Sequence, residues 1–469
     1  MKIFLVVPPF KLDQLYPGLG KIAPYFPPLE LAYIASSLKM QGHDIKILDC
    51  PALELDFSEL MDIVRNDEPD IAIIPTSSPI YSFVYSLYPP AKELIKLLKK
   101  TNPLTKTVLI GFISSVLSEN VLLSSGADFV VRGESEITCI ELCRAIQDKT
   151  KLEAIRGLGF REKGKIIINK ERDFIEDLDE LPPPAYSLLP LNKYRFISDT
   201  PVPVKGITLR ASRGCAFNCY FCPSAGFWKQ RIRSHSHKYV ISTMNYLYEN
   251  YNINRFQFHD DIFGVPKEWN IEFCTLLVKN KYRFKWDCYS HFRYLDEKVI
   301  NAMKKAGCHL VSLGIECGSD KMLKEFKGIT KHEIEEKLIL LKKSKMKMRL
   351  FFLIGPPAES EAEIEETIKY AIKLNPDIFA PTIVLPFPGS RFFQDMQPLG
   401  FTPDFDTFFS KKACDLPKFK KEDLERMIKK SYRQFYLRPA YIIRILPSLL
   451  KNIKNAFVYL YGLRYLLKK

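Results

Sequence analysis

The chain repeats one pattern through most of its length: a short apolar strand signal followed by a longer helical stretch. In residues 1–150 five strands are expected, and they lie at Ile3–Val7, Asp44–Leu48, Ile71–Pro75, Val108–Gly111 and Phe129–Arg132. Runs this short, apolar and β-branched are typical of parallel strands that are buried on both faces. The alternation predicts a doubly wound, Rossmann-like α/β domain whose ligands bind at the carboxyl ends of the strands.

The same alternation resumes between about residues 205 and 395. Six strands are expected there, at Ile207–Ala211, Arg255–Asp260, Lys285–His291, His309–Gly314, Arg349–Ile354 and Ile378–Leu385. Six strand–helix units predict a partial (β/α)6 barrel of the TIM type, with its chemistry at the C-terminal strand ends.

The remaining stretches set the expected domain boundaries. Residues 151–200 are expected to form an ordered linker with a hairpin turn at Lys163–Lys165 and a non-helical, proline-rich segment at Asp177–Pro184. The expected division is therefore an α/β domain at 1–150, a linker at 151–200, a barrel at 201–400 and a basic helical region at 401–469.

Three cysteines follow the first barrel strand directly. Cys215, Cys219 and Cys222 have the spacing C-x₃-C-x₂-C. Three thiolates on one loop can hold three irons of a [4Fe–4S] cluster and leave the fourth iron open to a substrate or cosubstrate. A structural zinc site would need a fourth ligand nearby, and the nearest candidates, His235 and His237, fit no usual finger spacing. Zinc and chance spacing remain the alternatives.

The other eight of the 11 cysteines are scattered along the chain. This distribution indicates a reducing cytosol rather than a disulfide framework, so we expect a cytoplasmic protein. No apolar run reaches the roughly 18 residues that a transmembrane helix needs.

The net charge of +15 is concentrated at the C-terminal end, where residues 426–469 contain Lys and Arg but neither Asp nor Glu. Very apolar stretches lie between these cations. The composition suits a helix at an anionic membrane surface, which would make the protein peripheral at the inner membrane face. The alternative is a helical cap packed on the barrel, with its cations in solvent. Nucleic acid is not expected as a partner because no base-stacking module is present.

The cysteine loop, the Asp177–Pro184 segment, Gly314–Cys317 and Gly355–Ser360 together resemble the cobalamin-binding (class B) radical SAM enzymes, and the domain order is similar over nearly the whole chain. The resemblance implies that S-adenosylmethionine (SAM) binds the open iron and that the reduced cluster cleaves it to a 5′-deoxyadenosyl radical. It also implies cobalamin-dependent methyl transfer to an unactivated carbon, and an electron donor such as flavodoxin or ferredoxin.

Two other functions stay open at this point. The chain also resembles anaerobic porphyrin-ester cyclases, which implies ring closure or oxidative rearrangement of a small, apolar substrate without methyl transfer. The second alternative is a membrane-surface module whose cluster only senses the redox state.

The resemblance also suggests which residues hold SAM. Asp260 and Asp261 would accept hydrogen bonds from its ammonium group, although a helix N-cap or a solvated turn explains them too. Arg293 would hold the SAM carboxylate, unless it forms only a surface salt bridge. Glu316 would bind ribose hydroxyls or be a buried, hydrogen-bonded glutamate. Gly355 would let the backbone approach the adenine or form a plain turn.

The remaining expected site residues belong to cobalamin. Thr76, Ser77 and Ser78 would lie against the corrin or its tail, and Gly111, Gly133 and Glu134 would border the nucleotide tail. The chain has no D-x-H-x-x-G motif, so no protein histidine is expected on the cobalt. The alternative is an α/β domain that has lost its ligand and only packs on the barrel.

Overall fold

The computed structural model describes residues 1–15, 23–77, 86–198, 204–356, 360–401 and 414–451. The chain divides into two compact units, and the boundary between them falls after Tyr194. Each unit is described by itself.

The first unit is built on one seven-stranded sheet with the order β2-β1-β3-β4-β5-β6-β7. Its strands are β1 (Lys2–Val7), β2 (Asp44–Asp49), β3 (Ile71–Pro75), β4 (Lys106–Ile110), β5 (Phe129–Val131), β6 (Leu158–Glu162) and β7 (Lys165–Ile168). The first five strands pair in parallel, as their continuous apolar runs predict. The predicted α/β fold of this part of the chain is confirmed.

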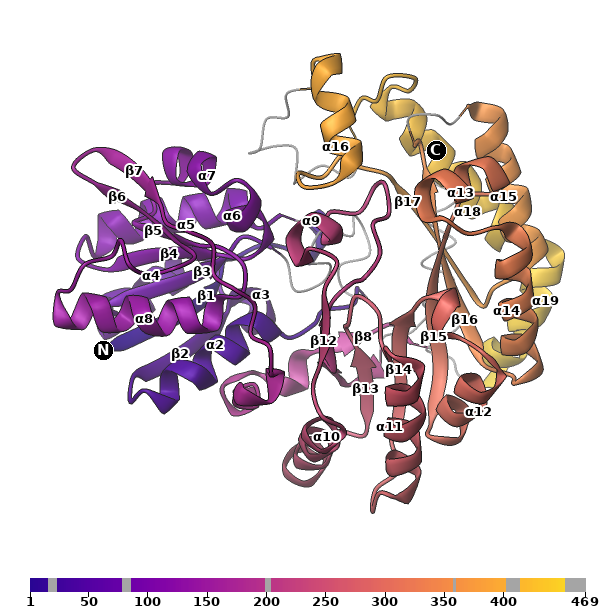
Figure 1. Cartoon of the computed structure of the whole chain (residues 1–469), viewed down its shortest axis with the longest axis horizontal. Coiled ribbons are helices and arrows are strands. Elements are labelled where there is room, and N and C mark those ends of the chain that lie inside the picture. Colours follow the sequence, from indigo (N-terminus) through magenta and orange to yellow (C-terminus); the bar gives the residue numbers. More distant parts are fainter. Residues whose placement is uncertain (16–22, 78–85, 199–203, 357–359, 402–413, 452–469) are drawn as a thin grey trace. The chain divides into compact units, whose positions relative to one another are not determined.

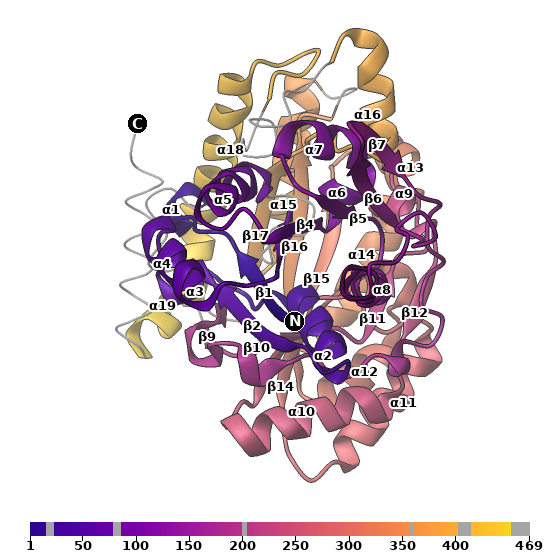
Figure 2. The same cartoon turned by 90° about the vertical axis from the view of Figure 1, so that its left-hand side faces the viewer.

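Helices cover both faces of this sheet (Figures 1 and 2). α2 (Leu29–Met40) and α8 (Ser135–Asp148) pack together, and α4 (Phe57–Asp67) packs against α5 (Tyr88–Thr101). Four shorter helices complete the unit: α1 (Leu12–Leu15), α3 (Cys50–Leu53), α6 (Phe112–Val116) and α7 (Ser118–Ser125).

Residues 158–168, expected within a linker, instead extend the sheet as the antiparallel pair β6 and β7. Lys163 and Gly164 between them both have positive φ, 47° and 79°. Two such residues form the type I′ turn that matches the twist of a hairpin. The proline-rich stretch that follows forms only 3₁₀ turns, at Leu178–Glu180, Tyr186–Leu188 and Leu191–Lys193.

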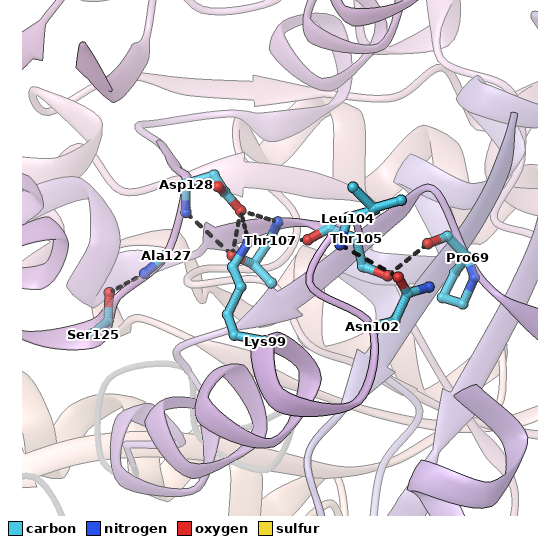
Figure 3. A network of polar contacts seen from close by, with 9 residues as sticks. All are labelled: Pro69, Lys99, Asn102, Leu104, Thr105, Thr107, Ser125, Ala127 and Asp128. Atoms are coloured by element: carbon cyan, nitrogen blue, oxygen red, sulfur yellow. Dashed lines mark hydrogen bonds and ion pairs between the residues drawn. The ribbon is translucent and has the colours of Figure 1, made fainter. Parts of the chain in front are cut away.

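A polar network fixes the amino edge of the first sheet (Figure 3). Asp128 accepts hydrogen bonds from the backbone N–H and the hydroxyl of Thr107, each at 2.8 Å, and pairs with Lys99. The Thr105 hydroxyl donates to the Pro69 carbonyl at 2.7 Å. These contacts join α5 to the first residues of β4 and β5, so the opposite, carboxyl edge is the one left for a ligand.

The second unit contains a six-stranded parallel sheet in strictly sequential order, which confirms the predicted partial (β/α)6 barrel. Its strands are β10 (Ile207–Leu209), β13 (Arg255–Phe258), β14 (Lys285–Ser290), β15 (Cys308–Glu316), β16 (Lys347–Ile354) and β17 (Ile378–Ile383). Between them lie α10 (His237–Tyr251), α11 (Lys267–Lys279), α12 (Glu297–Lys305), α13 (Asp320–Lys327), α14 (Lys331–Lys343) and α15 (Glu361–Leu374). Figure 1 shows α11, α12, α14 and α15 along the outer side of the strands. A short hairpin, β8 (Arg195–Phe196) and β9 (Val204–Lys205), precedes the sheet.

Helices also close the C-terminal side of this unit. α16 (Arg391–Met396) and a 3₁₀ turn (Gln397–Leu399) precede α18 (Lys421–Tyr436) and α19 (Pro439–Lys451). Phe435 of α18 stacks on Phe379 of β17 with ring centroids 4.7 Å apart, so α18 is a packed cap of the sheet. Of the helices that the structure describes, none combines the length and apolarity needed to cross a bilayer.

Candidate functional site

The three-cysteine loop begins at the carboxyl edge of the barrel sheet, close behind β10. The short strand β11 (Ser212–Gly214) pairs antiparallel with β12 (Ile232–Ser234) and carries the chain into the loop. Gly214 has φ 100°, and a Cβ on it would lie 2.0 Å from the Arg231 carbonyl oxygen. Only glycine fits this position, because a side chain would collide with the paired strand.

The three cysteines lie close enough to influence one another's charge. The Cys222 N–H donates to the Cys219 carbonyl at 3.1 Å and so closes the second half of the loop. Burial raises the pKa of Cys215 and of Cys222 to about 12 and also raises that of Cys219. The thiols are therefore neutral until a metal displaces their protons.

This donor set fits a [4Fe–4S] cluster. Each thiolate of such a cluster binds a different iron, so the three sulfurs do not need to converge on one ion. In the described ranges, no three His, Cys, Asp or Glu side chains converge closely enough to hold a single metal ion.

Aromatic side chains hold the cysteine loop on the barrel. Tyr220 stacks on Phe326 and Phe392, with ring centroids 5.0 and 5.7 Å apart, and its N–H donates to the Phe326 carbonyl. Phe217 stacks on His291, which directly follows β14, at 3.9 Å. The loop is thus fixed to elements from both halves of the sheet, and its position does not depend on the cysteines alone.

The two aspartates after β13 have different surroundings. Asp260 is buried and accepts hydrogen bonds from the Ala211 N–H at 3.0 Å and the Ser212 hydroxyl at 2.5 Å, and burial raises its pKa to about 7. Asp261 accepts from the Ser224 hydroxyl at 2.9 Å, and burial raises its pKa too. Asp260 therefore ties the base of the loop to β13. The negative charge of Asp261 contributes to the raised pKa of Cys215 and of Cys222.

Glu316 forms an ion pair with Lys327, a residue that the sequence did not single out. The Lys327 ammonium lies 2.9 Å from the Glu316 carboxylate, and the two side chains are only 6% and 11% exposed. Lys327 also donates to the Gly314 carbonyl. Its positive charge opposes the rise that burial causes in the pKa of Cys219. No sequence pattern marks Lys327, because α13 carries two further lysines at helical spacing, as a solvent-exposed helix face does.

The backbone at Glu316 is strained. Glu316 has φ 78°, and the pairing of β15 with β16 is irregular between Gly314 and Glu316. A Cβ on Gly314 would lie 2.0 Å from a Glu316 carboxylate oxygen. Strain of this kind is typical of functional positions that the surrounding structure holds in place.

Arg293, like Lys327, lies near the cysteine loop. Its guanidinium donates to the Gly328 carbonyl at 2.8 Å and lies 5.4 Å from the centre of the Phe217 ring. Burial, and then the charges of Lys327 and Arg293, lower the pKa of His291 to about 2, so this ring is neutral. Lys327 and Arg293, together with Arg391, are the cations whose charges act on Cys219.

Gly355 lies after β16, but its missing side chain makes room for a helix. It has φ 87°, and a Cβ on it would lie 2.6 Å from a Leu424 methyl carbon of α18. The glycine is therefore required for packing on that side. The following residues 357–359 lie outside the described ranges.

In the first unit, Thr76, Ser77 and Gly111 meet at the carboxyl ends of β3 and β4. The Thr76 hydroxyl donates to the Ile110 carbonyl at 2.7 Å, and the Ser77 hydroxyl accepts from the Phe112 N–H at 3.1 Å. Both side chains therefore hold the strand ends together. Ser78 lies outside the described residues.

The edge continues after β5. The Gly133 N–H donates to the Ser115 hydroxyl at 2.9 Å, and Glu134 accepts from the Ile175 N–H at 2.8 Å. Gly133 has φ 73°, and a Cβ on it would meet no atom within 4 Å. The backbone at Gly133 is therefore open on that side. The assignment of Gly133 to the nucleotide tail of cobalamin, which the family resemblance implies, stays a prediction.

Asp49, a buried acid at the end of β2, has a structural role that the sequence analysis did not predict. Asp49 accepts hydrogen bonds from the phenols of Tyr25 and Tyr194, the latter at 2.8 Å. Burial raises the pKa of Asp49 to about 6. The trio joins Tyr194, where the long first segment of this unit ends, to the edge strand of its sheet.

Comparison with known proteins accounts for both units. Residues 209–371 match the model of the radical SAM superfamily, and residues 17–143 match that of the B12 binding domain. An uncharacterized methyltransferase of Pyrococcus horikoshii is 35% identical over 451 residues, which cover 95% of this chain and 94% of that protein. This chain belongs to the cobalamin-binding radical SAM enzyme family.

Two further similarities agree with this assignment. The anaerobic magnesium-protoporphyrin IX monomethyl ester cyclase of Rubrivivax gelatinosus is 27% identical over 437 residues, covering 91% of this chain and 76% of the cyclase. The solved structure of the radical SAM methyltransferase TsrM from Kitasatospora setae superposes with a TM-score of 0.68 at 17% identity, covering 85% of this chain and 75% of TsrM. At that identity the second similarity concerns the fold.

Proposed function

We propose that this enzyme transfers a methyl group to an unactivated carbon, with cobalamin as the methyl carrier and SAM as both methyl and radical source. One observation carries the proposal: the three-cysteine loop lies at the carboxyl edge of a parallel barrel in a chain whose other unit is a B12-binding domain. The nearly full-length similarity to a methyltransferase supports it.

Cys215, Cys219 and Cys222 would hold the [4Fe–4S] cluster. A reduced cluster of this kind supplies one electron for cleavage of SAM to a 5′-deoxyadenosyl radical, while cobalamin supplies the methyl group. The protein's own contribution is to bind these groups, orient them and exclude water.

Charged side chains beside the loop match the parts of SAM. Asp261 would accept from the SAM ammonium, and Asp260 would fix the strand ends beneath it. Lys327 and Arg293 would attract the SAM carboxylate, and Glu316 would accept from the ribose hydroxyls. Gly355 would then border the adenine only on the side that Leu424 leaves open.

In the first unit, the edge formed by Thr76, Ser77 and Gly111 would bind the corrin or its tail, and Gly133 and Glu134 would border the nucleotide end. The first of these sites would also include Ser78, which lies outside the described residues. The absence of a D-x-H-x-x-G motif from the sequence means that cobalt would have no histidine ligand of this type.

The test is anaerobic reconstitution with iron, sulfide and hydroxocobalamin, followed by reaction with methyl-deuterated SAM and a low-potential reductant. We expect deuterated methyl on the protein-bound cobalamin and release of 5′-deoxyadenosine. A Cys222→Ala variant should bind cobalamin equally well but release no 5′-deoxyadenosine. A wild-type enzyme that binds iron and cobalamin but never labels the cobalamin would contradict methyl transfer.

Ring closure or oxidative rearrangement is the second candidate, because the chain is similar to an anaerobic cyclase over 91% of its length. Product mass separates the two reactions, since methylation adds one carbon and cyclisation adds none. Both need a one-electron donor, for which flavodoxin or ferredoxin is the expected type. The substrate would be small and apolar.

α19 offers a surface for an anionic membrane. Arg444 donates to the Asn375 and Pro376 carbonyls beyond the end of α15, and Tyr441 is buried, so this face is anchored. On the other face Ile443 and Leu450 are 70% and 79% exposed. An apolar stripe on a helix whose charged residues are all cations is typical of an interfacial helix.

Sedimentation with vesicles tests this surface. We expect wild-type protein to bind vesicles rich in phosphatidylglycerol but not pure phosphatidylcholine, and Ile443→Glu to abolish the binding. Ile339→Glu is the matched control, because Ile339 is an equally apolar, exposed residue of α14. Equal binding of both variants would exclude α19 as the membrane surface.

A further inference from the structure

His291 has a buried hydrogen-bonding nitrogen that the protein does not use. The residue is 5% exposed, and its Nε2 atom makes no hydrogen bond within the described structure. A buried polar atom without a partner is energetically costly, so such atoms are rare in native proteins. One that lies at the mouth of a barrel indicates that a bound group supplies the missing partner.

The other ring nitrogen shows which kind of partner is required. The Arg293 N–H donates to His291 Nδ1 at 3.3 Å, so Nδ1 is unprotonated. A neutral imidazole carries one proton, which must then be on Nε2. Nε2–H is therefore a donor that needs an acceptor, and a neutral ring in this state cannot bind iron through Nε2.

The position of the ring shows where that acceptor lies. The imidazole stacks at 3.9 Å on Phe217, which stands between Cys215 and Cys219 in the loop. His291 and Cys219 are also influenced by the same two cations, Lys327 and Arg293. The acceptors that the loop would gather at this place are sulfurs: cysteine thiolates and the sulfides of the cluster.

We propose that His291 Nε2–H donates a hydrogen bond to a sulfur of the [4Fe–4S] cluster and thereby raises the reduction potential of that cluster. The inference rests on the cluster assignment in the proposed function. Hydrogen bonds to the sulfurs are among the interactions that set cluster potentials, because they stabilise the more negative, reduced state. His291 is a positioning and tuning residue, and it does not touch the reacting carbon.

The test compares three variants of the full-length holoprotein. His291→Phe keeps an aromatic ring against Phe217 and removes the donor. His291→Gln removes the ring but retains an amide N–H near the position of Nε2. His332→Phe is the control, because His332 is an exposed histidine of α14 in the same unit. Each reconstituted protein is titrated with dithionite without SAM, and the reduced cluster is followed by electron paramagnetic resonance.

We expect a more negative midpoint potential in H291F, a potential closer to wild type in H291Q, and no change in H332F, all at equal iron content. Equal potentials in H291F and wild type would overturn the proposal. A shift that appears only when SAM is present would overturn it too, because Nε2 would then serve the cosubstrate. Wild-type protein that forms no four-iron cluster would refute the cluster assignment itself, which is a different result.

A second measurement remains decisive if H291F cannot hold a cluster. Wild-type holoprotein labelled with ¹⁵N-histidine is reduced and studied by pulsed electron paramagnetic resonance. A weak coupling between the cluster spin and a histidine nitrogen, retained in H332F, supports the proposal. The lack of any such coupling in the wild type overturns it.

Discussion

Replacement of Lys327 by methionine tests the buried ion pair directly. Methionine keeps most of the apolar stem and removes the ammonium group, so Glu316 remains as a carboxylate that is 11% exposed and has lost its partner at 2.9 Å. Removing one member of a buried pair typically costs about 3–5 kcal/mol, because the remaining charge is desolvated and uncompensated. We expect a loss of this size in the free energy of unfolding of the barrel unit.

The chain is well suited to this measurement. Its three tryptophans, Trp228, Trp269 and Trp286, all belong to the second unit, so tryptophan fluorescence during urea unfolding reports on the barrel alone. Lys324→Met on the exposed side of the same helix is the control and should change stability by no more than about 0.5 kcal/mol.

The double variant Glu316→Gln with Lys327→Met removes both charges. It should recover much of the stability that Lys327→Met loses, because no unpaired charge remains buried. A single variant as stable as wild type, or a double variant less stable than the single one, would refute the reasoning that Glu316 depends on Lys327.

Three further predictions concern individual residues. Asp260 has a folded-state pKa of about 7, above its unfolded value, so between about pH 4 and pH 7 the folded barrel binds more protons than the unfolded chain. The free energy of unfolding, measured by tryptophan fluorescence, should therefore fall as pH rises through this range. Asp260→Asn should make the free energy of unfolding less dependent on pH. Gly214→Ala should reduce the iron content after reconstitution, measured by colorimetric iron assay, because its Cβ would collide with the Arg231 carbonyl. Gly133→Ala should weaken cobalamin binding in equilibrium dialysis more than it lowers the melting temperature, because its Cβ would enter open space while its φ of 73° costs about 1 kcal/mol.

The architecture was predictable because each element carries a local signal. The parallel strands are continuous apolar runs, and the predicted Ile71–Pro75 strand has the observed bounds. β6 and β7 were missed as sheet strands although their turn was foreseen. Their pairing with β5 is a non-local contact, and no local pattern distinguishes a hairpin in a linker from one that extends a sheet.

The site was predictable only where the spacing of residues along the sequence indicates the chemistry. The cysteine loop is such a case. Lys327 and His291 become notable only through partners distant in sequence, namely Glu316 and Phe217, and through burial that no helical or strand pattern specifies. Gly355 has a packing role that its position after a strand did not reveal, because Leu424 fills the space on one side of it.

The anchoring of α19 has a mechanical consequence. Arg438 donates to the Ile372 carbonyl and Arg444 to the Pro376 carbonyl, so two guanidinium groups grip the chain at the end of α15. A helix held at two points cannot swing like a tether. If its apolar stripe docks on a bilayer, the barrel must dock with it at a fixed tilt. That tilt sets the direction from which a lipid-dissolved molecule reaches the strand ends. Two arginines that are remote from the cysteines in sequence therefore determine this direction.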